Sequence, residues 1–333
     1  MTTLVTGGSG FVGGHVVRAL LRRGGGDVRC LARPGSDRSN FEGLKVEVIE
    51  GDLRNQAKLR EACQGCGDVY HCAADYRLFA REPRDIYASN VDGTRNLLRA
   101  AALAGARRIV YTSSVGALGL EPDGTAAAEA TRVTLASMVG HYKRSKYLAE
   151  RVAEEWAAEG APVVIVNPST PVGERDVKPT PTGRIILDFL NRRMPAYVAT
   201  GLNLIDVRDV ATGHLLAAEL GRVGEKYILG CRNMTMVELL QALAEITGLP
   251  APRLRLPHWI PIGTAALSTG WARLVGAEPR VPLEAALMSR EMMFFDSGKA
   301  VRELGLPQTP VEAALARAVR WFEETGYVTR PRR

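Results

Sequence analysis

The sequence predicts an α/β fold, a doubly wound parallel sheet followed by a smaller C-terminal portion. Two observations predict it. Over residues 2–167, short apolar runs alternate with longer amphipathic segments, which is typical of successive βαβ units. After Asn167 the alternation stops at a stretch rich in Pro, Thr and Gly, residues 168–183. We therefore expect one domain over 1–167 and a second portion over 168–333, from which 206–220 and 226–229 could return to the sheet.

The elements of the first domain follow from periodicity. The expected strands are short apolar runs, at residues 2–6, 27–32, 45–50, 68–73, 107–112 and 163–167. The expected helices have apolar residues at helical spacing and charged outer faces, at residues 11–23, 56–63, 85–104 and 141–159.

Composition narrows the function classes. With 46% hydrophobic and 24% charged residues, this chain of 333 residues can bury a core. Its longest apolar tract, 259–267, contains Pro261 and falls short of the roughly 20 residues of a membrane span. No signal-peptide pattern is expected, so we predict a cytoplasmic protein. The net charge of +7 comes from scattered arginine pairs, which argues against nucleic-acid binding and leaves peripheral association with an acidic lipid surface open.

The cysteines do not predict a metal site. There are five, an odd number that indicates reduced thiols. Cys63 and Cys66 form a CxxC pattern, with His71 and Cys72 close behind. Because Cys72 lies in an apolar run that reads as a buried strand, no complete tetrahedral set is expected.

A glycine-rich loop joins the first strand directly to the first helix. Glycines at this junction permit a tight turn and let the backbone approach a pyrophosphate, while the first N–H groups of the helix face the anion. The residues expected to bind it are Gly7, Ser9, Gly10, Phe11, Val12 and Gly13. The first domain is therefore predicted to be a dinucleotide-binding Rossmann domain.

The end of the second strand indicates which dinucleotide binds. A protein that prefers NAD usually has an acidic residue there, which binds the ribose hydroxyls. This chain has Arg33, with Arg38 within reach, and no carboxylate to repel a 2′-phosphate. We predict NADP as the cofactor, with NAD as the alternative.

Three residues form a candidate catalytic set. Tyr142 and Lys146 are four residues apart on a predicted helix, so that they share one face. A phenol needs a nearby cation to act as an acid–base catalyst at neutral pH, and Lys146 can supply it. Ser114 follows the strand at 107–112, at the sheet edge that binds ligands, and can hydrogen-bond a carbonyl or hydroxyl. Ser114 and Tyr142 are thus also expected to contact substrate.

These motifs resemble the extended short-chain dehydrogenase/reductase family. TGGSGFVG at 6–13, GDL at 51–53, YTSS at 111–114 and YKRSK at 142–146 occur in family order. That family includes sugar-nucleotide epimerases, dehydratases and dihydroflavonol-type reductases. HYKRSKYLAE and NPSTPVG are most similar to its hopanoid-associated sugar epimerase group.

The resemblance implies further roles. Asp52 and Leu53 would contact the adenine, Ala73 and Ala74 would line the cofactor cleft, Pro168 and Ser169 would lie beside the nicotinamide, and Lys146 would also bind its ribose. Asn90 would support the central helix. Two copies of the chain would form a homodimer through the helices at 85–104 and 141–159. Asp75 and Tyr76 follow the fourth strand at its ligand-facing end and are expected on the substrate side.

The substrate class rests on one departure from the family. Sugar-nucleotide enzymes of the family typically carry an Arg shortly before an IHV-like segment, where it contacts the diphosphate. This chain reads Ile205, Asp206 and Val207 there, with no Arg before Ile205 and with Asp206 where His is usual. An acid there disfavours a diphosphate unless a cation, Arg184 or Arg208, compensates. We therefore predict a reductase acting on a small, uncharged and partly apolar carbonyl or alcohol, in a pocket formed by 168–183 and the apolar segment around Trp259. The alternatives are an NDP-sugar epimerase or dehydratase and a non-enzymatic dinucleotide sensor or scaffold.

Overall fold

A parallel sheet of seven strands forms the centre of the protein. The computed structural model describes residues 1–24, 26–77, 82–275 and 283–329. The sheet has the order β10-β6-β5-β4-β1-β2-β3. Its strands are β1 (Thr2–Thr6), β2 (Val28–Ala32), β3 (Glu47–Glu50), β4 (Cys66–His71), β5 (Arg108–Thr112), β6 (Val163–Pro168) and β10 (Lys226–Leu229). The order reverses between β1 and β4, and ligands of such sheets bind outside the carboxyl ends at this point. The predicted doubly wound fold is confirmed.

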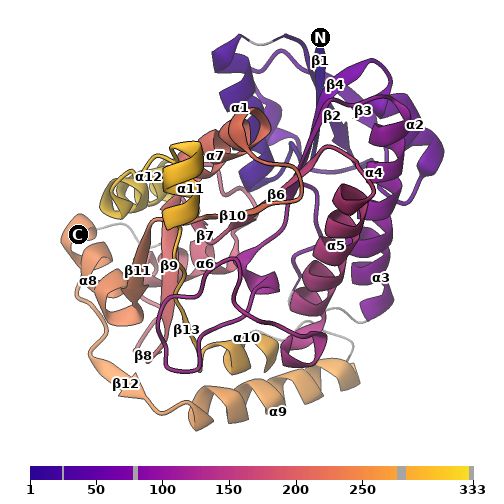
Figure 1. Cartoon of the computed structure of the whole chain (residues 1–333). Helices are drawn as coiled ribbons and strands as arrows, with labels where there is room; N and C mark the ends of the chain where they lie inside the picture. Colours follow the sequence, from indigo (N-terminus) through magenta and orange to yellow (C-terminus); the bar gives the residue numbers. More distant parts are fainter. Residues whose placement is uncertain (25, 78–81, 276–282, 330–333) are drawn as a thin grey trace.

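Helices cover both faces of the sheet (Figure 1). On one face lie α2 (Gln56–Cys63), α4 (Gly93–Leu103) and α5 (Gly140–Ala158), which bury residues such as Leu59, Leu97 and Val152. On the other lie α1 (Phe11–Arg23), α7 (Val207–Leu220) and α11 (Gly298–Leu304), which bury Val16, Val210 and Leu304. The segments at 206–220 and 226–229 therefore do return to the first domain, as a covering helix and as an edge strand.

The predicted helix at 85–104 is interrupted. It consists of α3 (Pro83–Tyr87), a π-helical turn (Ala88–Asp92) and α4. The turn contains Asn90, whose side chain hydrogen-bonds outside its own helix. Such π-turns are frequent at functional sites.

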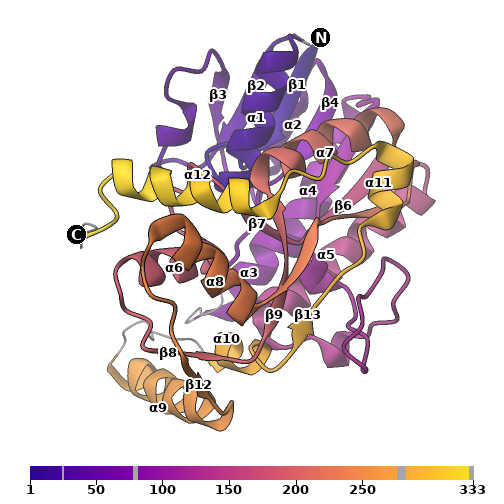
Figure 2. The same cartoon turned by 90° about the vertical axis from the view of Figure 1, so that its left-hand side faces the viewer.

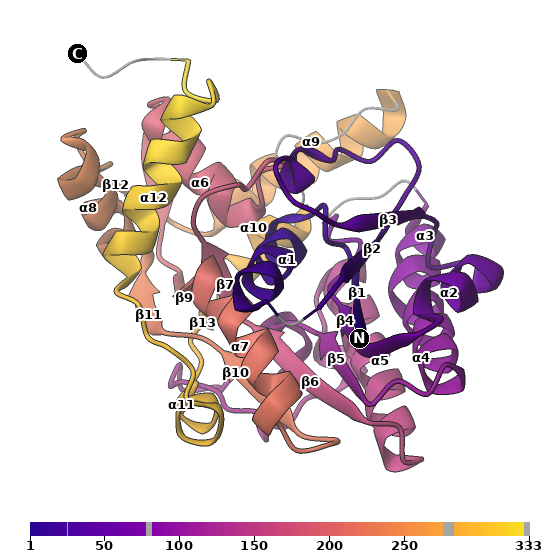
Figure 3. The same ribbon diagram turned by 90° about the horizontal axis from the view of Figure 1, so that it is seen from above.

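The C-terminal portion has its own small sheet and core (Figure 2). The sheet contains β7 (Thr170–Val172), β9 (Gly201–Asp206), β11 (Arg232–Thr235) and β13 (Met292–Met293). Against it pack α6 (Pro181–Leu190), α8 (Met236–Thr247) and α12 (Val311–Glu324), which share a core that includes Ile186, Leu239 and Leu315. At the outer end of this portion, β8 (Ala196–Val198) pairs with β12 (Leu254–Leu256), and α9 (Trp259–Val275) and α10 (Leu283–Met288) follow. Figure 3 shows the two portions side by side, with α7 and β10 between them.

The CxxC cysteines belong to the core. Cys63 ends α2 and Cys66 begins β4, where its thiol donates to the carbonyl oxygen of Ala62 at 3.3 Å. The fourth strand ends at His71, so that Cys72 follows it. The described residues contain no group of three or more His, Cys, Asp or Glu side chains suited to a metal ion. None of the described helices is both long and apolar enough to cross a membrane.

Candidate active site

The glycine loop leaves its backbone open to a ligand. Gly7 has a φ of 70°, and a Cβ atom there would lie 2.6 Å from the backbone nitrogen of Ala73. A Cβ at Gly13 would overlap the carbonyl oxygen of Gly7. Gly10 caps α1 without a side-chain hydrogen bond, and the first turn of α1 contains no acidic residue. Ser9, Phe11 and Val12 complete the loop. The free N–H groups at this helix start fit a pyrophosphate.

The ends of β2 and β3 carry the charges nearest to the expected adenosine. Arg33 is exposed, and its charge acts on Asp52 and Asp75. Arg38 is instead paired with Glu50. Hydrogen bonds from Arg54 lower the pKa of Asp52. Of Arg33 and Arg38, Arg33 is thus the one that has no carboxylate within ion-pair distance among the described residues.

Leu53 lies next to Asp52 but points elsewhere. Its side chain is buried in the core, so close to Gly93 that a Cβ there would lie 2.7 Å from it. The carbonyl oxygen of Leu53 accepts a hydrogen bond from Asn96 at 3.2 Å. The sequence did not predict this inward orientation.

A buried histidine joins the ends of β1 and β4 beneath the loop. The His71 ring contacts the hydroxyl oxygens of Thr6 at 2.8 Å and Thr94 at 3.0 Å. Burial lowers the pKa of His71 to about 3, so its ring is neutral. The Thr6 hydroxyl also accepts from the backbone of Ala73 at 3.3 Å. This contact fixes the position of Ala73, and hence of Ala74, beside the glycine loop.

Ser114, Tyr142 and Lys146 lie together at the carboxyl end of β5. The Lys146 ammonium donates to the carbonyl oxygen of Thr112 at 2.7 Å and to the hydroxyl of Tyr111 at 3.3 Å. Burial lowers the pKa of Lys146 to about 8. Burial raises the pKa of Tyr142, and a hydrogen bond with Ser114 opposes that rise. Ser114 thus contacts Tyr142, and Lys146 is anchored to the end of β5 one turn further along α5.

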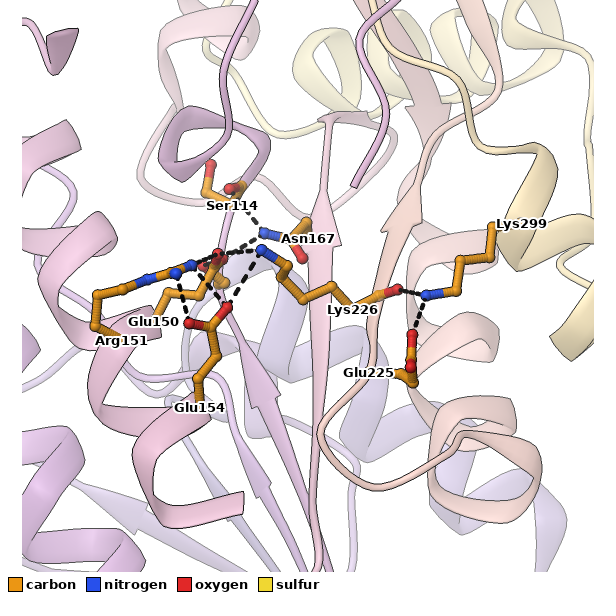
Figure 4. A network of polar contacts seen from close by, with 9 residues as sticks. Ser114, Glu150, Arg151, Glu154, Asn167, Glu225, Lys226 and Lys299 are labelled. Atoms are coloured by element: carbon orange, nitrogen blue, oxygen red, sulfur yellow. Dashed lines mark hydrogen bonds and ion pairs between the residues drawn. The ribbon is translucent and has the colours of Figure 1, made fainter. Parts of the chain in front are cut away.

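A buried carboxylate lies one turn beyond Lys146 on α5. Glu150 is fully buried and accepts from the Ser113 hydroxyl at 2.5 Å and from the Asn167 amide at 2.7 Å. The same amide donates to the carbonyl oxygen of Ser114 at 3.1 Å. Figure 4 shows Glu150 within this network, near Asn167 and near two cations, Arg151 at 3.2 Å and Lys226 at 3.5 Å. Sequence reasoning missed Glu150, although its spacing of four from Lys146 places it on the same helix face.

Asn90 connects the loop after β4 to the catalytic helix. Its amide oxygen accepts from the backbone of Asp75 at 2.7 Å. Its amide nitrogen donates to the carbonyl oxygen of Asp75 and to the hydroxyl of Ser145, each at 2.9 Å. Asn90 thus sets the position of Asp75 relative to α5.

The end of β6 presents unpaired polar atoms. Pro168 closes the strand, and the backbone of Ser169 donates to Leu229 at 2.9 Å. The Ser169 hydroxyl and the amide oxygen of Asn167 are buried and have no hydrogen-bond partner among the described residues. A polar ligand group at this position would satisfy them. They fit the carboxamide of a nicotinamide.

The expected substrate side contains one unexpected acid. Tyr76 is 38% exposed, and its hydroxyl donates to the carbonyl oxygen of Lys178 at 3.5 Å. Nearby, Asp176 is buried and accepts from the backbone and hydroxyl of Thr180 at 2.9 and 2.8 Å. Burial raises the pKa of Asp176 to about 6. Burial alone would raise the pKa of Asp75. Its hydrogen bonds and ion pair with Arg77 outweigh this effect, so the pKa of Asp75 is lowered.

Asp206 does not present a free negative charge. Its carboxylate caps α7 by accepting from the backbone of Arg208 at 2.9 Å, and it forms an ion pair with Arg317. The Arg208 side chain pairs instead with Glu174 at 2.7 Å. Arg208, one of the two cations considered for compensating Asp206, is thus engaged by another carboxylate. A residue far away in the sequence, on α12, supplies the charge.

In the apolar segment expected to contribute to the substrate pocket, the Trp259 ring itself does not line a cavity. Trp259 is 73% exposed on α9, and its side chain faces solvent. An apolar run in sequence does not reveal which of its side chains turn inward.

The comparisons agree with this architecture. The NAD dependent epimerase/dehydratase family matches residues 3–230. The chain is 49% identical over 328 residues to a Synechocystis protein named "Putative dihydroflavonol 4-reductase", covering 97% of this chain and 95% of that protein. It is 39% identical over 330 residues to sterol demethylase protein B of Methylococcus capsulatus, covering 98% and 100%. Among solved structures, a nucleoside-diphosphate-sugar epimerase from Pseudomonas aeruginosa is 31% identical with a TM-score of 0.80, covering 99% of each chain.

The fold and the site define an NAD(P)-dependent enzyme of the extended short-chain dehydrogenase/reductase class. The chain belongs to the NAD dependent epimerase/dehydratase family.

Proposed function

We propose that this protein is an NADP(H)-dependent reductase of an uncharged, partly apolar carbonyl compound. The observation that carries the proposal is the charge arrangement around Asp206. Arg317 is bound to Asp206 and Arg208 to Glu174, so neither arginine is available to a substrate diphosphate. Dihydroflavonols and sterols, which appear in the names of two relatives, are uncharged and largely apolar molecules.

In this proposal the residues of the chain divide the chemistry among them. When bound, the reduced nicotinamide supplies a hydride to the carbonyl carbon. Tyr142 donates its proton to the carbonyl oxygen, which Ser114 polarises by a hydrogen bond. The Lys146 ammonium stabilises the phenolate that remains. Ser169 and the loop Gly7–Gly13 hold the two ends of the cofactor.

Replacing Tyr142 by Phe tests the catalytic assignment. The variant should bind NADPH as the wild type does, while its kcat falls by at least about 100-fold, since it lacks the proton donor. Tyr147→Phe, on the same helix, is the matched control and should keep its activity. A Tyr142→Phe enzyme with near-normal kcat would show that another group transfers the proton.

Replacing Arg33 by Ala tests the cofactor preference. Arg33 follows β2 and has no ion-pair partner within the described part of the chain, so the variant should bind NADPH about tenfold or more weakly and NADH unchanged. Arg38→Ala serves as the control, because Glu50 already holds Arg38. Titration of both cofactors by fluorescence measures the effect. Equal loss for NADPH and NADH would remove Arg33 from 2′-phosphate recognition.

An NDP-sugar epimerase is the second candidate, favoured by the similarity to the Pseudomonas enzyme. The exposed Arg184, whose charge acts on Tyr76, could then contact a diphosphate. An epimerase returns the hydride to the same molecule, whereas a reductase releases oxidised cofactor. Incubation with NADPH and a panel of ketones, or with UDP- and dTDP-sugars, separates the two. Net NADPH consumption supports the reductase, sugar conversion without consumption supports the epimerase, and tight NADPH binding without any turnover supports a dinucleotide sensor.

A further inference from the structure

Helix α9 exposes an apolar face. Three of its large side chains are strongly exposed: Trp259 at 73%, Leu267 at 77% and Trp271 at 67%. The exposed residues in the described part of the helix are Trp259, Gly263, Thr264, Ala266, Leu267, Gly270 and Trp271. At 3.6 residues per turn they occupy one arc of roughly 160°. None of them is charged.

The opposite side of α9 faces the protein. Ala265, Thr269 and Ala272 are buried there. The helix thus presents a small inner face to the protein and a larger, bulkier apolar face to the surroundings, the reverse of an ordinary surface helix. Scattered exposed apolar residues are normal, but an uncharged helical face of this kind marks an interaction site.

The segment that leads into this face carries positive charge and no acid. Arg253 and Arg255 are exposed on either side of Leu254, which is itself 59% exposed and begins β12, the strand before α9. No Asp or Glu occurs over residues 246–277. Tryptophan prefers the boundary between water and lipid, and arginine is attracted to anionic headgroups. Figures 1 and 2 show that α9 and β12 lie together at the outer end of the C-terminal portion.

We propose that the face formed by Trp259, Leu267 and Trp271, together with Arg253 and Arg255, docks the protein onto an anionic lipid bilayer. The helix would lie in the plane of the interface with its tryptophan rings at headgroup depth. A second copy of the chain explains the apolar side chains but not the two exposed arginines beside them. The charges therefore favour the lipid surface.

The docking face is connected to the catalytic helix. The chain passes from α9 to α10, and the Glu284 carboxylate of α10 accepts a hydrogen bond from the backbone of His141 at 3.1 Å. His141 precedes Tyr142 in the first turn of α5. A bilayer bound at α9 would thus lie on the side of the protein where the catalytic helix begins. That an apolar substrate reaches the site from the bilayer rests on the proposed function, whereas membrane binding does not.

Sedimentation with vesicles tests the proposal on the full-length protein. The protein should bind mixed vesicles of phosphatidylglycerol and phosphatidylcholine. It should bind vesicles of phosphatidylcholine alone only weakly. The variant Trp259→Ser/Leu267→Ser/Trp271→Ser should bind at least about tenfold more weakly. Leu220→Ser, at a 56% exposed site on α7, is the matched control. The double variant Arg253→Glu/Arg255→Glu should bind anionic vesicles about 25-fold or more weakly. Its matched control is Arg22→Glu/Arg320→Glu, which changes the net charge equally.

Three outcomes would overturn the proposal: no binding to anionic vesicles, equal binding by the triple variant, or dissociation of an oligomer by that variant in analytical ultracentrifugation without any vesicle binding. The last would assign the face to a second copy. Circular dichroism and NADPH titration verify that each variant is folded. Because sedimentation needs no turnover, vesicle binding can succeed while ketone reduction fails, and the two ideas are judged separately.

Discussion

Replacing Glu150 by Gln should shift the pH dependence of catalysis. Glu150 is fully buried, and its charge raises the pKa of Lys146 against the stronger effect of burial. The glutamine keeps the shape and an acceptor oxygen but removes that charge. The pKa of Lys146 should therefore fall below its value of about 8. In the proposed mechanism Lys146 stabilises the Tyr142 phenolate only while it is protonated, so activity should be lost at a lower pH than in the wild type.

The same change should cost stability. The Glu150 carboxylate accepts two short hydrogen bonds, from Ser113 and Asn167. A hydrogen bond to a charged group contributes about 1.5–3 kcal/mol and one between neutral groups about 0.5–1.5 kcal/mol, so the two bonds together should lose about 2 kcal/mol. Arg151 and Lys226 keep Glu154 as a partner, at 2.6 and 3.2 Å, which limits further loss.

Glu154→Gln is the matched control. It lies one turn further along α5, removes the same charge and contacts the same two cations, but its side chain is 26% exposed. The assay is the profile of kcat against pH, together with urea unfolding. We expect the alkaline limb to move to lower pH for Glu150→Gln alone. Parallel profiles for the two variants would refute the coupling between Glu150 and Lys146, whatever happens to stability.

Two further predictions concern the loop and the buried acid. Gly13→Ala should abolish detectable NADPH binding, because the added Cβ would overlap the Gly7 carbonyl oxygen. Isothermal titration calorimetry measures the NADPH affinity, and retained affinity would mean that the loop moves freely. Asp176→Asn should alter the pH dependence of stability. In the folded wild type the pKa of Asp176, about 6, lies above its ordinary value of 3.8. As pH rises from about 4 to 7, the free energy of unfolding of the wild type should therefore fall by about 2–3 kcal/mol relative to that of the variant. Urea unfolding across this range measures the difference, and a constant difference would contradict the buried position of its charge.

The sequence predicted what short-range constraints determine. The glycine loop and the Tyr142–Lys146 spacing depend on residues that lie within one turn or one helix, so that pattern and geometry coincide. The doubly wound fold also followed from the alternation of short apolar runs with amphipathic segments, whereas the order of the strands did not. These features need no knowledge of distant partners.

Partners from distant segments could not be predicted. Glu150 meets Ser113 and Asn167 from two strands, and Asp206 meets Arg317 from α12, over separations that no local pattern encodes. The sequence showed an acid at Asp206 but not the arginine that neutralises it. It showed an apolar segment at Trp259 but not that the ring faces outward. In each case the missing information was which face of an element meets another element.

The first turn of the catalytic helix shows why such tertiary contacts matter for the chemistry. The residue before α5, Val139, offers no side-chain cap, and Gly140 has a φ of 79°. Glu284 from the C-terminal portion supplies the missing acceptor for the backbone of His141 and places a negative charge at the helix start. The position of Tyr142 therefore depends on α10 being in place. Packing of the C-terminal portion thus helps to order Tyr142, the proposed proton donor, and one carboxylate couples the two portions.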